Sequence, residues 1–138
     1  MNYIDIDRSF KKAISDIALS VNVPFFTNDN NPTDLDTFIH VLGTINMTDI
    51  LYTEQQMLLS VYSKKDIDEQ RVLNAFTSFL QNNKIDVYNY SDTGEKLGVI
   101  VVPNWKIESA GYNKNGYKVS TIIMTLKYKE VAVWVHHI

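Results

Sequence analysis

The sequence contains no cysteine. This absence excludes a disulfide framework, a zinc site built from thiolates and a cysteine nucleophile, although it leaves the redox compartment open. The N-terminal stretch MNYIDIDRSFKK has acidic residues where a signal peptide has its positive region, and no apolar segment follows it. No apolar run approaches the roughly 20 residues that cross a bilayer. We therefore expect a soluble protein with no membrane partner, made inside a cell and used or assembled there.

The chain also lacks an excess of basic residues. Lys and Arg number 13 against 16 Asp and Glu, so the net charge is −3 and the pI about 5.5, which argues against a nucleic-acid-binding domain. The charge is unevenly distributed: basic and acidic residues number 3 and 8 in residues 1–54, 5 and 6 in residues 55–103, and 5 and 2 in residues 104–138. An acidic front and a basic back can attract each other within one fold, which is the simpler interpretation, or between copies in a head-to-tail contact.

The remaining composition is that of an ordinary globular protein. The 138 residues are 45% hydrophobic and 21% charged, which suits a single domain spanning residues 1–138. A chain of this size hides roughly 70% of the surface that its unfolded form exposes, so it can build a core without covalent cross-links. No internal repeat or low-complexity segment divides it.

The first structural element is predicted to be an amphipathic helix. Apolar residues recur at helical spacing over residues 5–21, with Asp5 or Asp7 as the N-cap and Pro24 at the end. Residues 25–37 are dense in Asn, Asp, Thr and Pro, which predicts a loop.

Most of the remaining chain has the β-branched and apolar composition of strands. Strands are predicted at residues 38–47 with a bulge or bend at Gly43, 56–63, 85–90, 97–103, 117–129 and 131–137. Residues 48–55 are expected to form a connection, and residues 104–116 a loop or a long hairpin arm. Together with a second helix, these strands predict an α+β fold in which two helices pack on a largely antiparallel sheet of five to six strands.

The strands have one unusual property, because their middles are apolar on both faces. Consecutive apolar residues occur at 57–59, 99–102, 122–124 and 131–135, whereas a strand buried on one face alternates apolar and polar residues. Two helices can cover one face of such a sheet but hardly both. The other face is therefore expected to be covered by further strands of this chain or by a neighbouring subunit.

A strand-to-helix turn at residues 60–73, SVYSKKDIDEQRVL, is a common place for a ligand site. A phosphate-binding loop needs glycines, and this turn has none. Its acids Asp66, Asp68 and Glu69 complement the helix dipole but repel a phosphate. We therefore interpret it as the cap of a helix from Asp66 to about Leu80, with a capping box formed by Ser63 and Asp66 or by Asp66 and Glu69.

No group of residues predicts catalysis or metal binding. His40 is expected to be a core histidine, and the adjacent His136 and His137 point to opposite faces of a strand. The oxygen-rich segment 28–36 lacks the glycine and the terminal glutamate of an EF-hand loop. The serines lack a G-x-S-x-G setting. We expect no catalytic, cofactor-binding or metal-binding residue, and hence no enzyme.

Tyrosines and lysines occur close together in the C-terminal half of the chain. Lysines at 114, 118, 127 and 129 accompany tyrosines at 88, 90, 112, 117 and 128, which loosely resembles a platform for single-stranded nucleic acid. Given the acidic total, we favour the simpler interpretation of cross-strand partners on a sheet, and expect no specific nucleic-acid partner.

The order of the elements resembles that of the tail-terminator (neck) proteins of long-tailed bacteriophages and related prophages. The likeness covers roughly residues 5–135. After an N-terminal helix and a polar loop, it consists of TFIHVLG, QQMLLSVYS, DIDEQRVLNAFTSFLQ and strands that end in YKVSTIIMTLKYKEV.

This resemblance implies a non-enzymatic virion protein of the tail or neck, assembled in the host cytoplasm without a cofactor. It implies a homo-oligomeric ring, expected to be a hexamer, that stops growth of the tail tube and joins it to the head connector or head-closure protein. The residues that we expect at subunit or partner interfaces come from the acidic front, the 48–55 connection and the basic back: Asp34, Asp36, Asp49, Tyr52, Lys106, Lys114 and Lys118.

Two other functions fit the same sequence. One is another head–tail connector or a minor tail component, which shares the size and polarity. The other is a small acidic module of the immunity type, in which Asp34, Asp36 and Asp49 would contact a basic partner.

Overall fold

The computed structural model describes residues 3–27, 34–48, 53–90 and 92–128. Its elements are α1 (Tyr3–Ser20), β1 (Phe25–Phe26), β2 (Thr37–Thr48), β3 (Thr53–Ser63), α2 (Asp66–Leu80), β4 (Lys84–Tyr88), β5 (Lys96–Tyr112) and β6 (Lys118–Tyr128). In this described part, no helix is both long and apolar enough to cross a membrane. The strand predicted at residues 131–137, with His136 and His137, lies outside the described residues.

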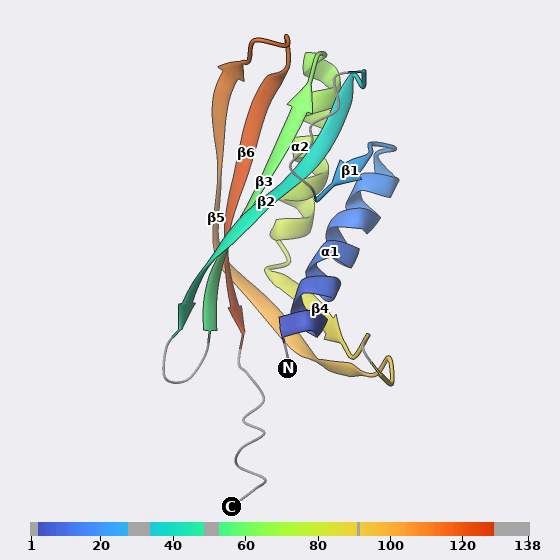
Figure 1. Cartoon of the computed structure of the whole chain (residues 1–138), viewed down its shortest axis with the longest axis vertical. Coiled ribbons are helices and arrows are strands. Elements are labelled where there is room, and N and C mark those ends of the chain that lie inside the picture. Colours follow the sequence, from blue (N-terminus) through green and yellow to red (C-terminus); the bar gives the residue numbers. More distant parts are fainter. Residues whose placement is uncertain (1–2, 28–33, 49–52, 91, 129–138) are drawn as a thin grey trace, which may run out of the picture.

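The strands form one curled sheet of six strands in the order β1-β2-β3-β6-β5-β4 (Figure 1). β1 is parallel to β2, and every other neighbouring pair is antiparallel. Both helices lie on the same side of the sheet, and the β4 end of the sheet curls beneath α1 (Figure 1). The predicted α+β fold class, two helices on a largely antiparallel sheet, is therefore confirmed.

Helix α1 buries one apolar stripe against the sheet. Ile6, Phe10, Ile14 and Ile17 recur at intervals of three or four residues and are all buried. The helix begins at Tyr3, before both of the predicted N-cap residues, and one of these, an aspartate at position 5, lies in its first turn. The predicted N-cap is therefore wrong.

The end of α1 is set by Asn22 rather than by Pro24. Asn22 adopts a left-handed conformation with φ of 57°. Its N–H donates to the Leu19 carbonyl at 3.1 Å, and the N–H of Val23 donates to the Ala18 carbonyl at 2.9 Å. This pair of bonds is the Schellman motif, in which asparagine is one of the few residues that tolerate the left-handed position.

Helix α2 has the predicted bounds but not the predicted cap. Its N-cap residue is Lys65, which makes no side-chain cap hydrogen bond, so the capping boxes proposed for Ser63 with Asp66 and for Asp66 with Glu69 are wrong. The Oγ of Ser63 instead donates to the Lys65 carbonyl at 2.7 Å and accepts from the Lys65 N–H at 3.1 Å. The turn is thus held by hydrogen bonds from Ser63, the last residue of β3, and not by a side chain of the helix.

Strands extend into two predicted connections. β2 and β3 stay paired as far as Thr48 and Thr53, so the connection predicted at residues 48–55 is shorter than expected. The register shift between Val41 and Thr44 places a bulge at the predicted position. Residues 104–112 continue β5 as the long hairpin arm that the sequence left open as one alternative.

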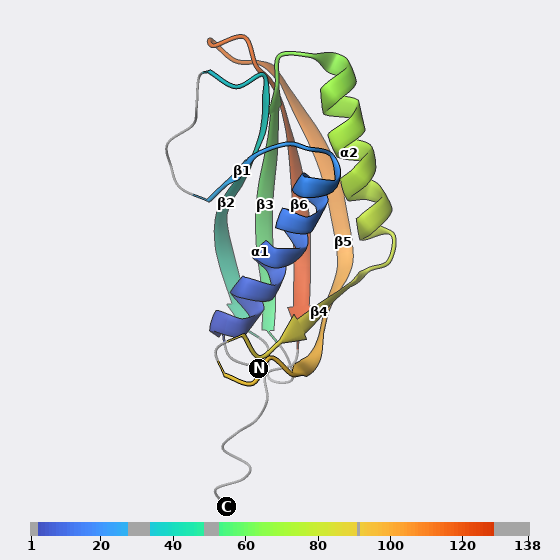
Figure 2. The same cartoon turned by 90° about the vertical axis from the view of Figure 1, so that its right-hand side faces the viewer.

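The core lies between the helices and one face of the sheet. From β3 and β6 it takes alternate residues, because side chains of a strand point to opposite faces in turn: Met57, Leu59, Val61, Ile122, Met124 and Leu126 are all buried. α2 contributes Val72, Phe76 and Leu80. No described element covers the other face of the sheet, since both helices lie in front of the same face (Figure 2).

Candidate interaction surface

The uncovered side of the sheet is here called the open face. Its members follow from the register of the central strands and comprise Glu54, Gln56, Leu58, Ser60 and Tyr62 of β3, Val119, Thr121, Ile123, Thr125 and Lys127 of β6, and Asn104, Lys106 and Glu108 of β5. Most of these side chains are half-buried or exposed. On β3 and along most of β6, their neighbours in the chain on the other face are buried.

The middle of the open face has a small apolar centre formed by Leu58 and Ile123, which lie opposite each other on β3 and β6. The same row ends at the charged and exposed Lys106 of β5. The next row is small and polar: the hydroxyls of Ser60 and Thr121 are hydrogen-bonded at 2.9 Å. An apolar centre with a polar surround is the composition typical of a surface that contacts another protein.

The charges on the open face balance. Lys106 Nζ lies 3.0 Å from a carboxylate oxygen of Glu108, and Lys127 Nζ lies 3.3 Å from one of Glu54. Both members of the first pair are more than half exposed, so solvent screens their attraction. The open face therefore has no strong charge of either sign.

One end of the open face is closed by the chain's own aromatic residues. Phe38 stacks on Tyr62 with ring centroids 4.7 Å apart, and Tyr117 meets Phe38 edge to face at 5.3 Å. The Lys64 ammonium lies 4.9 Å from the centroid of Tyr117. Phe38 is fully buried and Tyr117 nearly so. Tyr117 is thus a packed residue rather than part of a stacking platform for nucleic acid.

Lys118 was predicted at an interface, and it lies on the helix-covered side of the sheet. Its Nζ is 3.3 Å from Glu69 and 3.9 Å from Asp66, and the hydroxyl of Tyr112 donates to Asp66 at 3.2 Å. The hydrogen bond and the charge of Glu69 raise the pKa of Lys118 above its usual value. These contacts fasten the β5–β6 hairpin to the first turn of α2.

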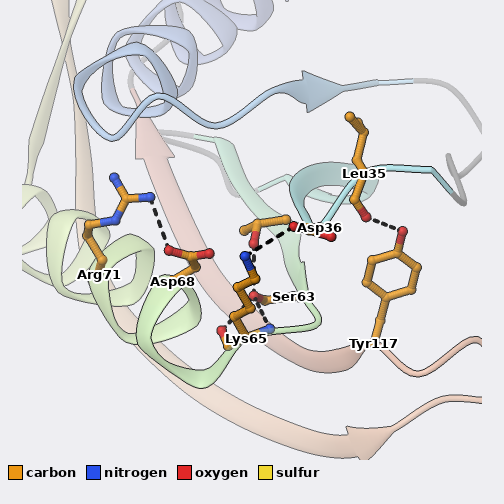
Figure 3. Close-up of polar contacts among 8 residues, drawn as sticks. Leu35, Asp36, Ser63, Lys65, Asp68, Arg71 and Tyr117 are labelled. Atoms are coloured by element: carbon orange, nitrogen blue, oxygen red, sulfur yellow. Dashed lines mark hydrogen bonds and ion pairs between the residues drawn. The ribbon is translucent and has the colours of Figure 1, made fainter.

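Asp36, another predicted interface residue, lies in the segment that leads into β2. Its carboxylate is 3.3 Å from Lys65 Nζ at the start of α2 (Figure 3). In the same view, the Tyr117 hydroxyl donates to the Leu35 carbonyl. Asp36 thus has a partner within the chain, although both it and its predicted companion Asp34 are exposed.

The other predicted interface residues are spread over the molecule. Lys114 is exposed in the β5–β6 turn, and Lys106 is exposed on the open face. Asp49 and Tyr52 lie outside the described residues. The structure thus places Lys114 and Lys118 at one hairpin and Lys106 farther along β5, and it does not gather the predicted set into one patch. Their role at an interface stays a prediction.

Two shallow grooves flank α1. One, of about 570 Å³, lies beside Arg8, Lys11 and Lys12, but Lys11 and Lys12 form ion pairs with aspartates one helical turn away. The other, of about 370 Å³, separates α1 from β4. Among the described residues, no three His, Cys, Asp or Glu side chains are grouped so that they could hold a metal ion. His40 is buried in β2.

The molecule is an α+β protein whose helices leave one face of a curled sheet uncovered. No protein-family model matches the sequence, and no curated protein matches it. Nine chains of solved structures are similar in fold. One is a chain of the "Virion of native gene transfer agent (GTA) particle", with a TM-score of 0.55 and 9% sequence identity over 83% of this chain and 84% of that chain. At this identity the likeness shows the fold alone.

The sequence predicted that the two helices cover only one face of the sheet, and it left open whether further strands of this chain or a neighbouring subunit cover the other. Among the described residues no second layer of strands does. The sequence did not predict which residues lie on that face. A signal was present in residues 54–62 and 119–127, where mostly buried residues alternate with mostly half-buried ones. Whether the odd-numbered or the even-numbered residues of a strand face the helices depends on its pairing with distant strands. Periodicity within one strand does not give that pairing.

Proposed function

We propose that this protein is a non-enzymatic structural subunit of a phage-like virion. The observation that carries the proposal is the fold shared with a chain of the gene transfer agent virion, which extends over most of both chains. The open face supports it, because a sheet without a cover on one side suits a subunit that is completed by assembly.

In finer detail, we propose a homo-oligomeric ring of about six copies at the neck of the virion. The ring would terminate the tail tube and join it to the head connector or head-closure protein. Support for this role comes from the resemblance of the element order to tail-terminator proteins. The apolar centre and balanced charges of the open face suit contact with another virion protein, and they suit neither a nucleic acid nor a membrane.

The ring is tested by the mass of the protein in solution. Light scattering at rising concentration should show a particle of about six times the 15.9 kDa chain, alone or with a tail-tube protein. A chain that stays monomeric under both conditions and binds no tail tube would overturn the proposal.

The contact with the tube is tested by placing a charge on the open face. Ile123→Asp should abolish co-sedimentation with tail tubes, because it puts a carboxylate at the apolar centre. The matched control is Leu19→Asp, which changes an apolar side chain that is 75% exposed on α1. Equal binding by both variants would exclude the open face as the contact.

A further inference from the structure

We propose that copies of this chain join edge to edge, with the free part of β5 in one copy pairing antiparallel with the free part of β2 in the next. This inference rests on the proposed ring and names the surface that builds it. The partner is a second copy of the chain, and the contact is made by backbone hydrogen bonds along two different strands, so it is heterologous.

The first free edge belongs to β5. β4 pairs with β5 only from Lys96 to Val101, and the N–H of Val102 donates to the Asn83 carbonyl at 2.8 Å. β5 continues to Tyr112, and beyond Val102 its described backbone pairs only with β6. Pro103, which has no N–H to donate, stands where the pairing with β4 ends.

The second free edge belongs to β2, on the opposite border of the sheet. β1 pairs with β2 only at Ile39 and His40. From Val41 to Thr48 the described backbone of β2 pairs with β3 on one side, and no described strand lies on the other. Figure 2 shows β2 and β5 on opposite sides of the central pair β3 and β6.

The strand directions fit. β2, β3, β6 and β5 alternate in direction, because each neighbouring pair among them is antiparallel. β5 therefore runs opposite to β2, and a neighbour in the same orientation brings its β2 antiparallel to β5. The sheet then continues from copy to copy without a change of pattern.

The lengths of the free edges also match. Bulges interrupt β5 at Val101/Asn104 and at Ser109/Gly111, which leaves Asn104–Ser109 as a regular segment. On β2 the regular segment after its bulge is Thr44–Thr48. Bulges and proline at an edge prevent open-ended pairing, so here they limit the contact to one short segment on each side.

The two segments are offset along the strands, and this offset fixes the geometry of the assembly. β1 occupies the Thr37 end of the β2 edge, whereas β4 occupies the Lys96 end of the β5 edge, at the opposite end of the sheet. A neighbouring copy must therefore shift along the strand direction before the two free segments can pair. A sheet that closes into a ring needs such a shift between its strands, because the strands tilt relative to the ring axis.

One exposed apolar residue is explained by the same contact. Ile107 lies opposite Ile122 on the helix-covered face, yet it is 36% exposed at the free edge. α2 lies over this side of the sheet and projects past β5 (Figure 2). A strand added beside β5 would lie under α2 and cover Ile107.

Cysteine cross-linking tests the pairing in a chain that has no cysteine of its own. Ile45 is paired with Gln56 in the backbone register, and the same row continues through Thr125 to Asn104 of β5. Ile45→Cys is combined in turn with Asn104→Cys, Lys106→Cys and Glu108→Cys. We expect mild oxidation of at least one double variant to give a ladder of covalent oligomers that ends at the ring size.

The control is Ile45→Cys with Asp86→Cys. The second thiol then lies on β4, which is not part of the proposed contact. This pair should give no ladder, and circular dichroism confirms that each variant is folded. A ladder from the control pair, or none from the three β5 pairs while light scattering still shows a ring, would overturn the edge pairing and leave the proposed ring standing. A strict monomer would overturn both.

Hydrogen exchange gives a second readout on the unmodified chain. The outward-facing amides of Asn104–Ser109 and Thr44–Thr48 should exchange slowly in the oligomer and at least ten-fold faster in the diluted monomer. Equal exchange in the two states would contradict the pairing.

Discussion

The two faces of the central sheet are built from the same strands and differ in almost every physical respect. On the helix-covered face, Leu59 and Ile122 lie opposite each other and are both fully buried. One residue away on each strand, Leu58 and Ile123 are also opposite each other, and both are only half-buried on the open face. The covered face therefore holds most of the buried apolar side chains of these strands, whereas no described helix or strand lies over the open face.

The same contrast holds for ion pairs. Lys118 and Glu69 on the covered face, and Lys127 and Glu54 on the open face, each have an N–O distance of 3.3 Å. Glu69 is almost completely buried, whereas Glu54 is about one-third exposed. The two lysines are almost equally exposed, at 30% and 32%, so the difference lies in the carboxylates. Equal geometry should therefore give unequal stabilisation, because solvent screens the second pair more strongly.

The largest effect is expected from a comparison of two adjacent leucines. Leu59→Ala should lower the free energy of unfolding by about 2–5 kcal/mol, since it leaves a cavity in the core. Leu58→Ala should lower it by roughly 1 kcal/mol or less, because that side chain keeps much of its contact with solvent. Urea unfolding of both variants measures the difference. Similar losses would mean that the two faces are equally buried in solution.

The next effect is expected from the covered ion pair. Lys118→Ala should lower the free energy of unfolding more than any other change in this hairpin, because it leaves the buried Glu69 carboxylate without its cation. Glu69 Oε2 already lacks a hydrogen-bond partner among the described residues. No described side chain is therefore in place to replace the lysine ammonium. Lys114→Ala in the neighbouring turn is the control and should change stability by less than about 0.5 kcal/mol. Equal costs would mean that the hairpin is not fastened to α2 by this pair.

These contrasts also explain how much could be predicted from the sequence. The bounds of α2 were predicted correctly, because Val72, Phe76 and Leu80 repeat at the helical period and asparagines follow. That the helices cover only one face of the sheet was predicted from consecutive apolar residues, since Leu58 and Leu59 cannot both face the helices. Local periodicity is enough for features of this kind.

Features that depend on distant pairing could not be predicted. The arm of β5 contains Gly111 and many polar residues, as loops do, and its place beside β6 follows only from the register. The two-residue strand β1 lies in a polar segment and exists only through its pairing with β2. The ion pair of Asp36 with Lys65 could not be predicted either, because the two residues are distant in the sequence.

A smaller effect is expected at high pH. The pKa of Lys118 is raised above its ordinary value of 10.5, mainly by the hydrogen bond and charge of Glu69. Its contribution to stability is therefore complete below that value and is lost as the pH rises through the raised pKa. The stability difference between the native chain and Lys118→Ala should shrink above pH 10.5. Because the other titrating groups are present in both chains, this difference isolates Lys118. A constant difference would contradict the assignment.

The smallest effect is expected from the open-face ion pair. A double-mutant cycle on Lys127 and Glu54 should give a coupling of about 0–1 kcal/mol, which disappears in roughly 1 M salt. The corresponding cycle on Lys118 and Glu69 should give a larger coupling that survives the salt, because the Glu69 carboxylate is buried. If the tail tube covers the open face, the coupling of Lys127 with Glu54 should rise in the complex with the tube, where solvent no longer screens the pair. A coupling that is large in the monomer would show instead that the open face is already shielded before any partner binds.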